Sequence, residues 1–195
     1  MQTPSKICRR LTLSLVLTGC GLACAASPLS AQTISDPVFG LSVTPPSGYI
    51  AQLLTPQPSQ LVLIAVQRSQ SGNAGCLAEF RSDDTGGKLT QADFNARASS
   101  ADWIEAVRAE VSARYDIHSM DPIEHAGVRG TAIAGYRFYQ GSASATATRK
   151  YTREWYVILD TTKGRTTLEC AALRPEFEER HIEFEAILRG MSLPK

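Results

Sequence analysis

Four side chains between residues 118 and 125 have the chemistry needed to bind a metal ion. His118, Asp121, Glu124 and His125 supply two imidazoles and two carboxylates, which are ligands for divalent cations. Their spacing matches no established zinc pattern, and strand alternation places His118 and His125 on opposite faces unless Pro122 bends the chain. We therefore interpret the cluster as a strand end and its turn, and the sequence predicts no metal site and no cofactor.

Cysteine is the next candidate for chemistry. Of the five cysteines, Cys76 and Cys170 lie in the body of the chain. In an oxidising compartment such a pair most simply forms a disulfide, which we predict, the alternative being two separately buried thiols. A reduced Cys170 beside His181 would instead be a nucleophile pair. That pair defines an alternative function, a small hydrolase or redox enzyme built from scattered residues.

Other catalytic motifs are absent from the sequence. It has no His-Glu-x-x-His, no Gly-x-Ser-x-Gly and no Gly-x-x-x-x-Gly-Lys. The segment Asp83 to Gly87 resembles the start of a calcium loop but lacks the later glutamate, so we interpret it as a turn. We predict no catalytic residues and favour a non-enzymatic domain that binds or assists another protein.

The amino terminus has the pattern of a bacterial signal peptide. Lys6, Arg9 and Arg10 precede a short apolar run over residues 11–26, followed by small residues. The run is shorter and more diluted by polar residues than a spanning helix requires, so we expect no membrane span after processing. The sequence predicts an exported, periplasmic protein.

Two cleavage routes are open. Ala31 is the small residue that signal peptidase requires, and cleavage there starts the mature chain at Gln32. The segment ending in Cys20 instead resembles a lipobox, which would give a lipid-anchored envelope protein. We favour the first route, which leaves residues 32–195 as a single domain. Removing three basic side chains and no acidic ones lowers the formal charge from +1 to −2. That charge favours neither nucleic acid nor an anionic membrane as a partner.

The remaining sequence alternates between strand and helix patterns. Thr90 and Asp93 form a capping box, and apolar residues then recur at helical spacing to about residue 114, as one helix or as two broken at Ser99–Ser100. The stripe comprises Phe94, Ala98, Ala101, Ile104, Val107 and Val111. A last helix opens at Pro175. The expected strands are 38–43, 49–54, 61–66 (buried on both faces), 75–81, 116–124, 128–140, 151–160 and 165–173, with a hairpin tip at 141–148.

These elements indicate an α+β fold with a mainly antiparallel sheet flanked by helices. Most aromatic side chains of the paired strands, Tyr136, Phe138, Trp155 and Tyr156, should be core, and any on an uncovered face would suit an interface.

Residues 39–49, Phe-Gly-Leu-Ser-Val-Thr-Pro-Pro-Ser-Gly-Tyr, resemble the opening hairpin of the PsbP-like family, which includes PsbP and DcrB-type envelope proteins. Residues 123–130, the paired strands through 173 and the closing helix follow in the same order. The resemblance covers nearly the whole mature chain and implies an antiparallel sheet flanked by helices. It implies no shared catalytic residues. Members mostly bind or assist other proteins, so the partner expected here is an envelope protein.

Overall fold

A computed structural model describes residues 32–69, 71–82, 89–138 and 152–194 of the chain. The predicted signal segment with Cys20 and Ala31, the calcium-like segment 83–87 and the hairpin tip 141–148 lie outside these residues. The elements are, in order, β1 (Ile34–Ser35), β2 (Ser42–Val43), β3 (Tyr49–Leu54), β4 (Val62–Arg68), β5 (Ser71–Ser82), α1 (Gln91–Ala98), α2 (Ala101–Ser112), β6 (Tyr115–His125), β7 (Val128–Arg137), β8 (Thr152–Thr161), β9 (Gly164–Leu173), the 3-10 turn η2 (Arg174–Glu176), α4 (Phe177–Arg189) and β10 (Met191–Ser192).

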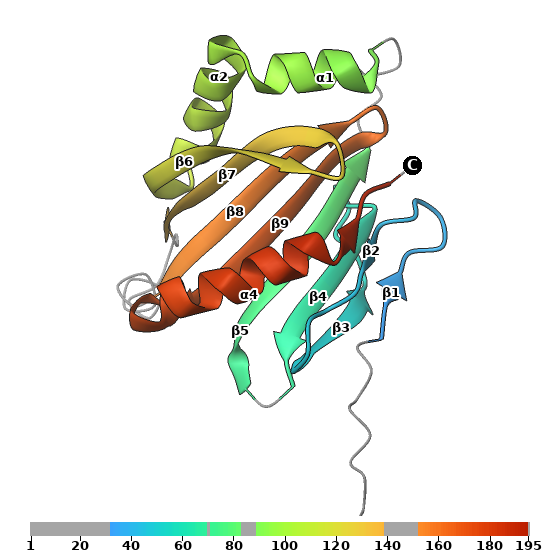
Figure 1. The fold of residues 1–195 in the computed structure, drawn as a ribbon, viewed down its shortest axis with the longest axis vertical. Coiled ribbons are helices and arrows are strands. Elements are labelled where there is room, and N and C mark those ends of the chain that lie inside the picture. The colour runs from blue at the N-terminus through green and yellow to red at the C-terminus, as the bar shows by residue number, and fades with distance from the viewer. Residues whose placement is uncertain (1–31, 70, 83–88, 139–151, 195) are drawn as a thin grey trace, which may run out of the picture.

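Seven strands form one antiparallel sheet in the order β3-β4-β5-β9-β8-β7-β6. The short strands β1, β2 and β10 form a second, three-stranded sheet. Helix α4 crosses the large sheet, and α1 and α2 lie at its β6–β7 end (Figure 1). The predicted class, α+β with a mainly antiparallel sheet, is confirmed.

The main core lies between the sheet and α4. Strand alternation sends Val62, Ile64 and Val66 of β4 to this face, where they pack with Phe184 and Ile187 of α4 and are at most 1% exposed. Burial of such side chains stabilises the fold by about 1.5–3 kcal/mol each. Phe184 and Ile187 therefore lie on the buried face of α4.

A polar cluster ties α4 to the edge of the sheet. The Glu183 carboxylate of α4 accepts hydrogen bonds from the Tyr49 hydroxyl of β3 and the Arg68 guanidinium of β4. Arg180, one turn earlier, donates to the same carboxylate at 3.1 Å. Burial of Tyr49 and its bond to Glu183 raise the pKa of the phenol to about 12.

The second core lies under α1 and α2. The Thr90 hydroxyl accepts from the Asp93 amide and the Asp93 carboxylate accepts from the Thr90 amide, so the predicted capping box is present. Ser100 caps a separate α2, so the segment forms two helices. Trp103 of α2 is buried, whereas Ala101 is exposed and its predicted place on the apolar stripe is wrong. The break at Ser99–Ser100 explains this, because it restarts the helical phase.

The predicted strand over 38–43 is shorter than expected. The Asp36 carboxylate accepts hydrogen bonds from the amides of Val38 (3.0 Å) and Phe39 (2.6 Å) and holds a turn there. Gly40 ends that turn in a left-handed conformation, with φ +80°. The strand therefore comprises only Ser42–Val43.

The expectation that the strand at 61–66 is buried on both faces holds only in part, because Ala65 is buried on the second face but its neighbours on that face are not. Leu63 is only half-buried and Leu61 is 37% exposed, because α1 and α2 cover the β6–β8 end of the sheet and not β4. None of the helices among the described residues is long and apolar enough to cross a membrane.

Candidate functional site

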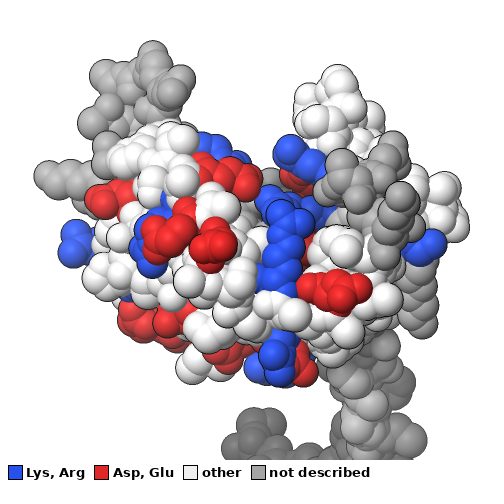
Figure 2. Space-filling view, turned by 90° about the horizontal axis from the view of Figure 1, so that it is seen from above, with Lys and Arg blue, Asp and Glu red and all other residues white. Residues whose placement is uncertain are grey.

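The face of the sheet that carries α1 and α2 continues past them as an open surface. Two adjoining hollows, of about 200 and 240 Å³, lie on it between α2 and strands β4, β5 and β9. We call them together the groove, which is lined by Gln57, Gln60, Leu63, Leu77, Glu79, Arg81, Glu110, Arg114, Arg137, Tyr156, Arg165, Thr167 and Glu169. The space-filling view shows a hollow with basic side chains along it (Figure 2).

Strand alternation and register place the side chains of the groove floor. Cys76 faces α4, so Leu77 faces the groove, and every second residue of β5 follows it. In the register of β5 against β9, Leu77 pairs with Glu169 and Glu79 pairs with Thr167. The floor is therefore amphipathic, with aliphatic side chains on β4 and β5 beside charged ones on β5 and β9.

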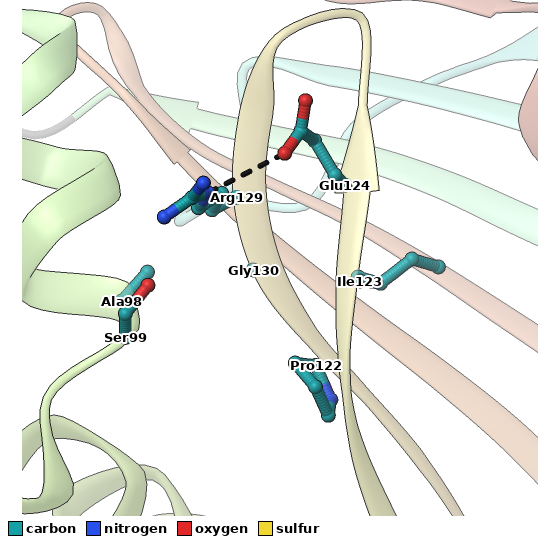
Figure 3. A pocket seen from close by; sticks show the side chains of 7 residues that line it. All are labelled: Ala98, Ser99, Pro122, Ile123, Glu124, Arg129 and Gly130. Atoms are coloured by element: carbon teal, nitrogen blue, oxygen red, sulfur yellow. Dashed lines mark hydrogen bonds and ion pairs between the residues drawn. The ribbon is translucent and has the colours of Figure 1, made fainter.

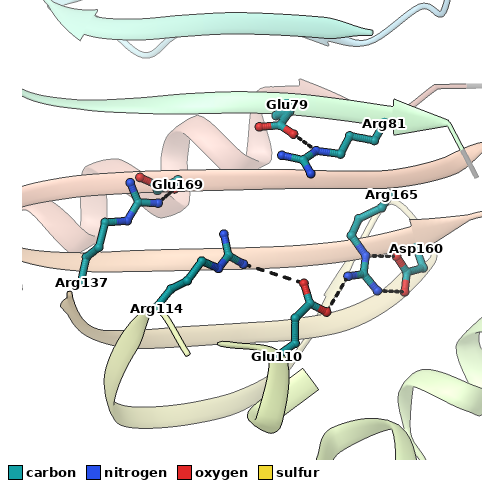
Figure 4. A network of polar contacts seen from close by, with 8 residues as sticks. All are labelled: Glu79, Arg81, Glu110, Arg114, Arg137, Asp160, Arg165 and Glu169. Carbon is teal, nitrogen blue, oxygen red and sulfur yellow. Dashed lines mark hydrogen bonds and ion pairs between the residues drawn. The ribbon is translucent and has the colours of Figure 1, made fainter. Parts of the chain in front are cut away.

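Three of the four arginines in the groove contact carboxylates closely (Figure 4). Arg81 pairs with one carboxylate oxygen of Glu79. The other oxygen accepts a hydrogen bond from the side-chain Nε2 of Gln60 at 2.6 Å. Arg165 makes two bonds, of 2.7 and 3.1 Å, to the Asp160 carboxylate. The Arg165–Asp160 pair joins register partners on β9 and β8, and in both pairs the opposite charges neutralise each other.

Arg137 is the third paired arginine and the most enclosed. Its guanidinium contacts Glu169 and lies 3.4 Å from Glu154, which is 2% exposed. Burial has the largest single effect and would lower the pKa of Arg137, but Glu169, Tyr115 and Glu154 together outweigh it and raise that pKa. Burial also raises the pKa of the Glu169 carboxyl, with Arg137 opposing the rise.

Arg114 differs from the other three. It follows α2, and its side chain is 44% exposed. Its guanidinium lies 3.8 Å from the Glu110 carboxylate, which is itself 3.2 Å from Arg165. The guanidinium carbon is 5.6 Å from the ring centroid of Tyr156, which is buried under it. A charged, exposed donor group is thus held over the middle of the groove.

The predicted disulfide is present on the opposite side of the floor. The Cys76 and Cys170 sulfur atoms are 2.01 Å apart and both residues are almost fully buried. They are register partners on β5 and β9, one residue before Leu77 and one after Glu169. The bond therefore links the two strands that form the groove floor.

The structure disperses the polar cluster at 118–125. The His125 Nε2 atom is 2.8 Å from the Met191 carbonyl oxygen, on the α4 side. Glu124 pairs instead with Arg129 at 3.3 Å, and an irregularity in strand pairing occurs at His118. In the part of the chain that the structure describes, no group of three or more His, Cys, Asp or Glu side chains converges as a metal site requires.

His181 and Cys170 do not form a nucleophile pair. Cys170 is consumed by the disulfide. The imidazole of His181 lies between the rings of Trp155, at 5.0 Å, and Phe177, at 5.8 Å. It is a packed side chain of the α4 layer.

The aromatic side chains of the paired strands are mostly core. Trp155 and Tyr156 are buried on opposite faces of β8. Tyr136 is half-buried under the Arg174 guanidinium, and Phe138 is 37% exposed.

Another cavity, of about 320 Å³, lies between the α1–α2 junction and the β6–β7 hairpin (Figure 3). Its charged groups are Glu124 and Arg129, which pair with each other and are both more than half exposed. The two charges offset each other and the rest of the lining has no ionisable side chain, so this cavity is a weaker candidate than the groove.

The arginines of the groove were missed in the sequence. The sequence signal that could have indicated this face is an alternation in residues 77–81 and 165–169. Every second residue of these strands lies in the core, and the positions between them carry the charged side chains. That pattern shows a face that is not core, but it does not show that α2 brings Arg114 over it.

The fold and the groove define a disulfide-bonded α+β domain in which one half of a sheet face is open. This is a PsbP-like fold. The chain is similar to cyanobacterial PsbP (CyanoP) from Synechocystis sp. PCC 6803, whose solution structure it matches with a TM-score of 0.53 at 11% identity, over 91% of this chain and 98% of that one. A crystal structure from Bacteroides thetaiotaomicron VPI-5482 matches at a TM-score of 0.44 and 11% identity, over 86% and 50% of the chains. No protein-family model and no curated protein sequence matches the chain.

Proposed function

We propose that this chain is an exported, non-enzymatic accessory domain of the bacterial envelope that holds a protein partner in the groove. The observation that carries the proposal is the groove itself, an amphipathic hollow on the open half of a sheet face. Aliphatic side chains beside fixed charges are suited to contact a protein surface. The PsbP-like fold is compatible with this role, although a fold alone does not define a function.

Export is supported by two independent features. The amino terminus has the signal-peptide pattern, and the Cys76–Cys170 bond belongs to an oxidising compartment. Periplasmic release after Ala31 and lipid anchoring at Cys20 remain the two processing routes. The intact mass of the exported protein separates them, and we expect a chain that starts at Gln32. A lipidated Cys20 would place the domain on a membrane surface instead.

The groups that line the groove favour binding over catalysis. Glu79 and Glu169 both contact arginines, and the thiol that led the enzyme alternative is oxidised. Glu169, with its raised carboxyl pKa, is the group that acid–base catalysis would use. We expect esterase, peptidase, phosphatase and redox screens to stay at background. A reproducible turnover removed by Glu169→Gln would overturn the non-enzymatic assignment.

Site-specific photo-crosslinking in the native envelope tests the binding function. A photoreactive amino acid replaces Leu77, which is 41% exposed in the groove, or Ile182, which is 68% exposed on α4. We expect a discrete protein adduct from position 77 and none from position 182. Equal adducts from both positions, or none from position 77, would contradict the assignment of the groove.

A further inference from the structure

We infer that the groove binds a peptide segment of its partner that presents an aspartate or glutamate side chain next to apolar ones, and that Arg114 binds this carboxylate. The inference rests on the proposed function and names the chemistry of the partner. It depends on one guanidinium, on its aliphatic surroundings and on the charges that face it.

The backbone holds Arg114 in place independently of its side chain. Its amide donates to the Val111 carbonyl at 2.9 Å, and its carbonyl accepts from the Phe138 amide at 2.6 Å. The guanidinium lies over the Tyr156 ring. A planar, pre-positioned fork of donors of this kind matches a carboxylate.

The charges around Arg114 leave it as the available cation. Glu79 and Glu169 are each in contact with another arginine, and Glu110, 3.8 Å away, is shared with Arg165. At that distance the Glu110 contact is an ion pair without a short hydrogen bond. A carboxylate entering the groove would therefore find donors on Arg114 that no described residue already satisfies.

Aliphatic side chains stand next to this charge. Leu77 is 41% exposed, and Leu63 lies beside it on β4, half-buried. Both line the same hollow as Arg114. A partner whose apolar side chains cover Leu63 and Leu77 would exclude water from the new ion pair, and exclusion of water strengthens such a pair.

A polyanion fits the groove poorly. Nucleic acid and anionic lipid surfaces bind several basic groups at once. Here the carboxylates of Glu79, Glu110 and Glu169 lie among the arginines, with Glu154 and Asp160 behind them. These five carboxylates outnumber the four arginines, so a row of phosphates would be repelled, whereas a single carboxylate needs only the donors of Arg114.

Binding of synthetic peptides to the mature, oxidised protein tests the inference. Three fluorescein-labelled octapeptide sets share flanking positions randomised over Leu, Val and Ser, and differ in a central Glu, Gln or Lys. We expect fluorescence polarisation to show about five- to tenfold tighter binding of the Glu set than of the Gln set, the gain typical of a partly shielded charged hydrogen bond. Leu77→Ser should weaken all three sets alike.

Variants identify the residue responsible. Arg114→Gln should abolish the preference for Glu and Arg114→Lys should keep part of it. Arg108→Gln, on an exposed arginine of α2 that does not line the groove, should leave it unchanged. Thermal melting of each variant verifies the fold.

Four outcomes would overturn the inference: equal binding of the Glu and Gln sets, a preference for Lys, a preference for Glu that survives Arg114→Gln, or binding of no set. Arg114-dependent binding to phosphatidylglycerol vesicles would also overturn it and assign the site to a lipid headgroup. In each case an adduct from position 77 would still support the groove as a protein-binding site, so the two proposals fail separately.

Discussion

Removing the Cys76–Cys170 disulfide should destabilise the domain strongly without changing its fold. The perturbation is the double substitution Cys76→Ala/Cys170→Ala. The bond closes a long loop, with a sequence separation of 94 residues. Opening that loop lets the unfolded chain expand, and most of the lost stability comes from this gain of unfolded-state entropy.

The loop length sets the magnitude. Chain entropy alone gives about 4.7 kcal/mol for a loop of this size, and measured disulfides more often contribute about 2–4 kcal/mol. Both cysteines are nearly fully buried, so alanine also removes packing worth about 1 kcal/mol at each site. We expect a loss of about 4–6 kcal/mol, which lowers Tm by about 8–24 °C for a domain of this size.

Urea unfolding followed by tryptophan fluorescence provides the assay, because Trp103 and Trp155 are buried on opposite faces of the sheet. Reducing the wild-type protein with a phosphine breaks the cross-link but keeps both sulfur atoms. The comparison with the double variant therefore separates the stability lost with the cross-link from the stability lost with the packing of the sulfur atoms. The m-value should rise on reduction, because the unfolded chain exposes more surface. An unfolding free energy that changes by less than about 0.5 kcal/mol on reduction, or native protein that alkylates at both cysteines without reductant, would refute the reasoning.

Three further predictions follow from the ionisable groups. Glu183→Gln removes the charged acceptor that ties α4 to the sheet and should cost about 1–2 kcal/mol by urea unfolding, whereas Glu185→Gln, on an exposed pair, should cost less than about 0.5 kcal/mol. The raised pKa of Tyr49 means that the unfolded state loses its phenol proton first, so the free energy of unfolding should fall as pH rises from 10 to 12 and stay level just below pH 10; a flat profile across that window would contradict this. Arg137→Gln leaves enclosed carboxylates without their cation and should cost about 2–4 kcal/mol at pH 7. That deficit should shrink at pH 4.5, because protonation removes the charge on Glu169; a deficit that is constant between the two pH values would show that charge burial is not its cause.

Local signals in the sequence were sufficient for most elements. The Thr90 capping box and the serine break before α2 each depend on contacts within a few residues, and each is present. The Cys76–Cys170 pair was available from composition and compartment alone, since no other cysteine remained in the body of the chain.

Features that depend on layer packing could not be predicted in the same way. The apolar run at 61–66 indicated a strand buried on both faces, yet one face is open because α1 and α2 end over β8. The contact of His125 with the Met191 carbonyl likewise joins residues that are far apart in the sequence. Arg114 has no local pattern, because its role comes from where α2 ends relative to β9.

The disulfide and the groove depend on each other through strand alternation. Cys76 and Cys170 face α4, so their neighbours Leu77 and Glu169 face the groove at a spacing that the bond constrains. Oxidation therefore stabilises the floor on which Arg114 acts, and a reduced chain would hold β5 and β9 together by hydrogen bonds and packing alone. A site built on this bond is best formed after export to an oxidising compartment, which agrees with the signal pattern at the amino terminus. Equally tight peptide binding by the oxidised protein and by the reduced, still folded protein would contradict this dependence. It would show that the groove floor forms without the cross-link.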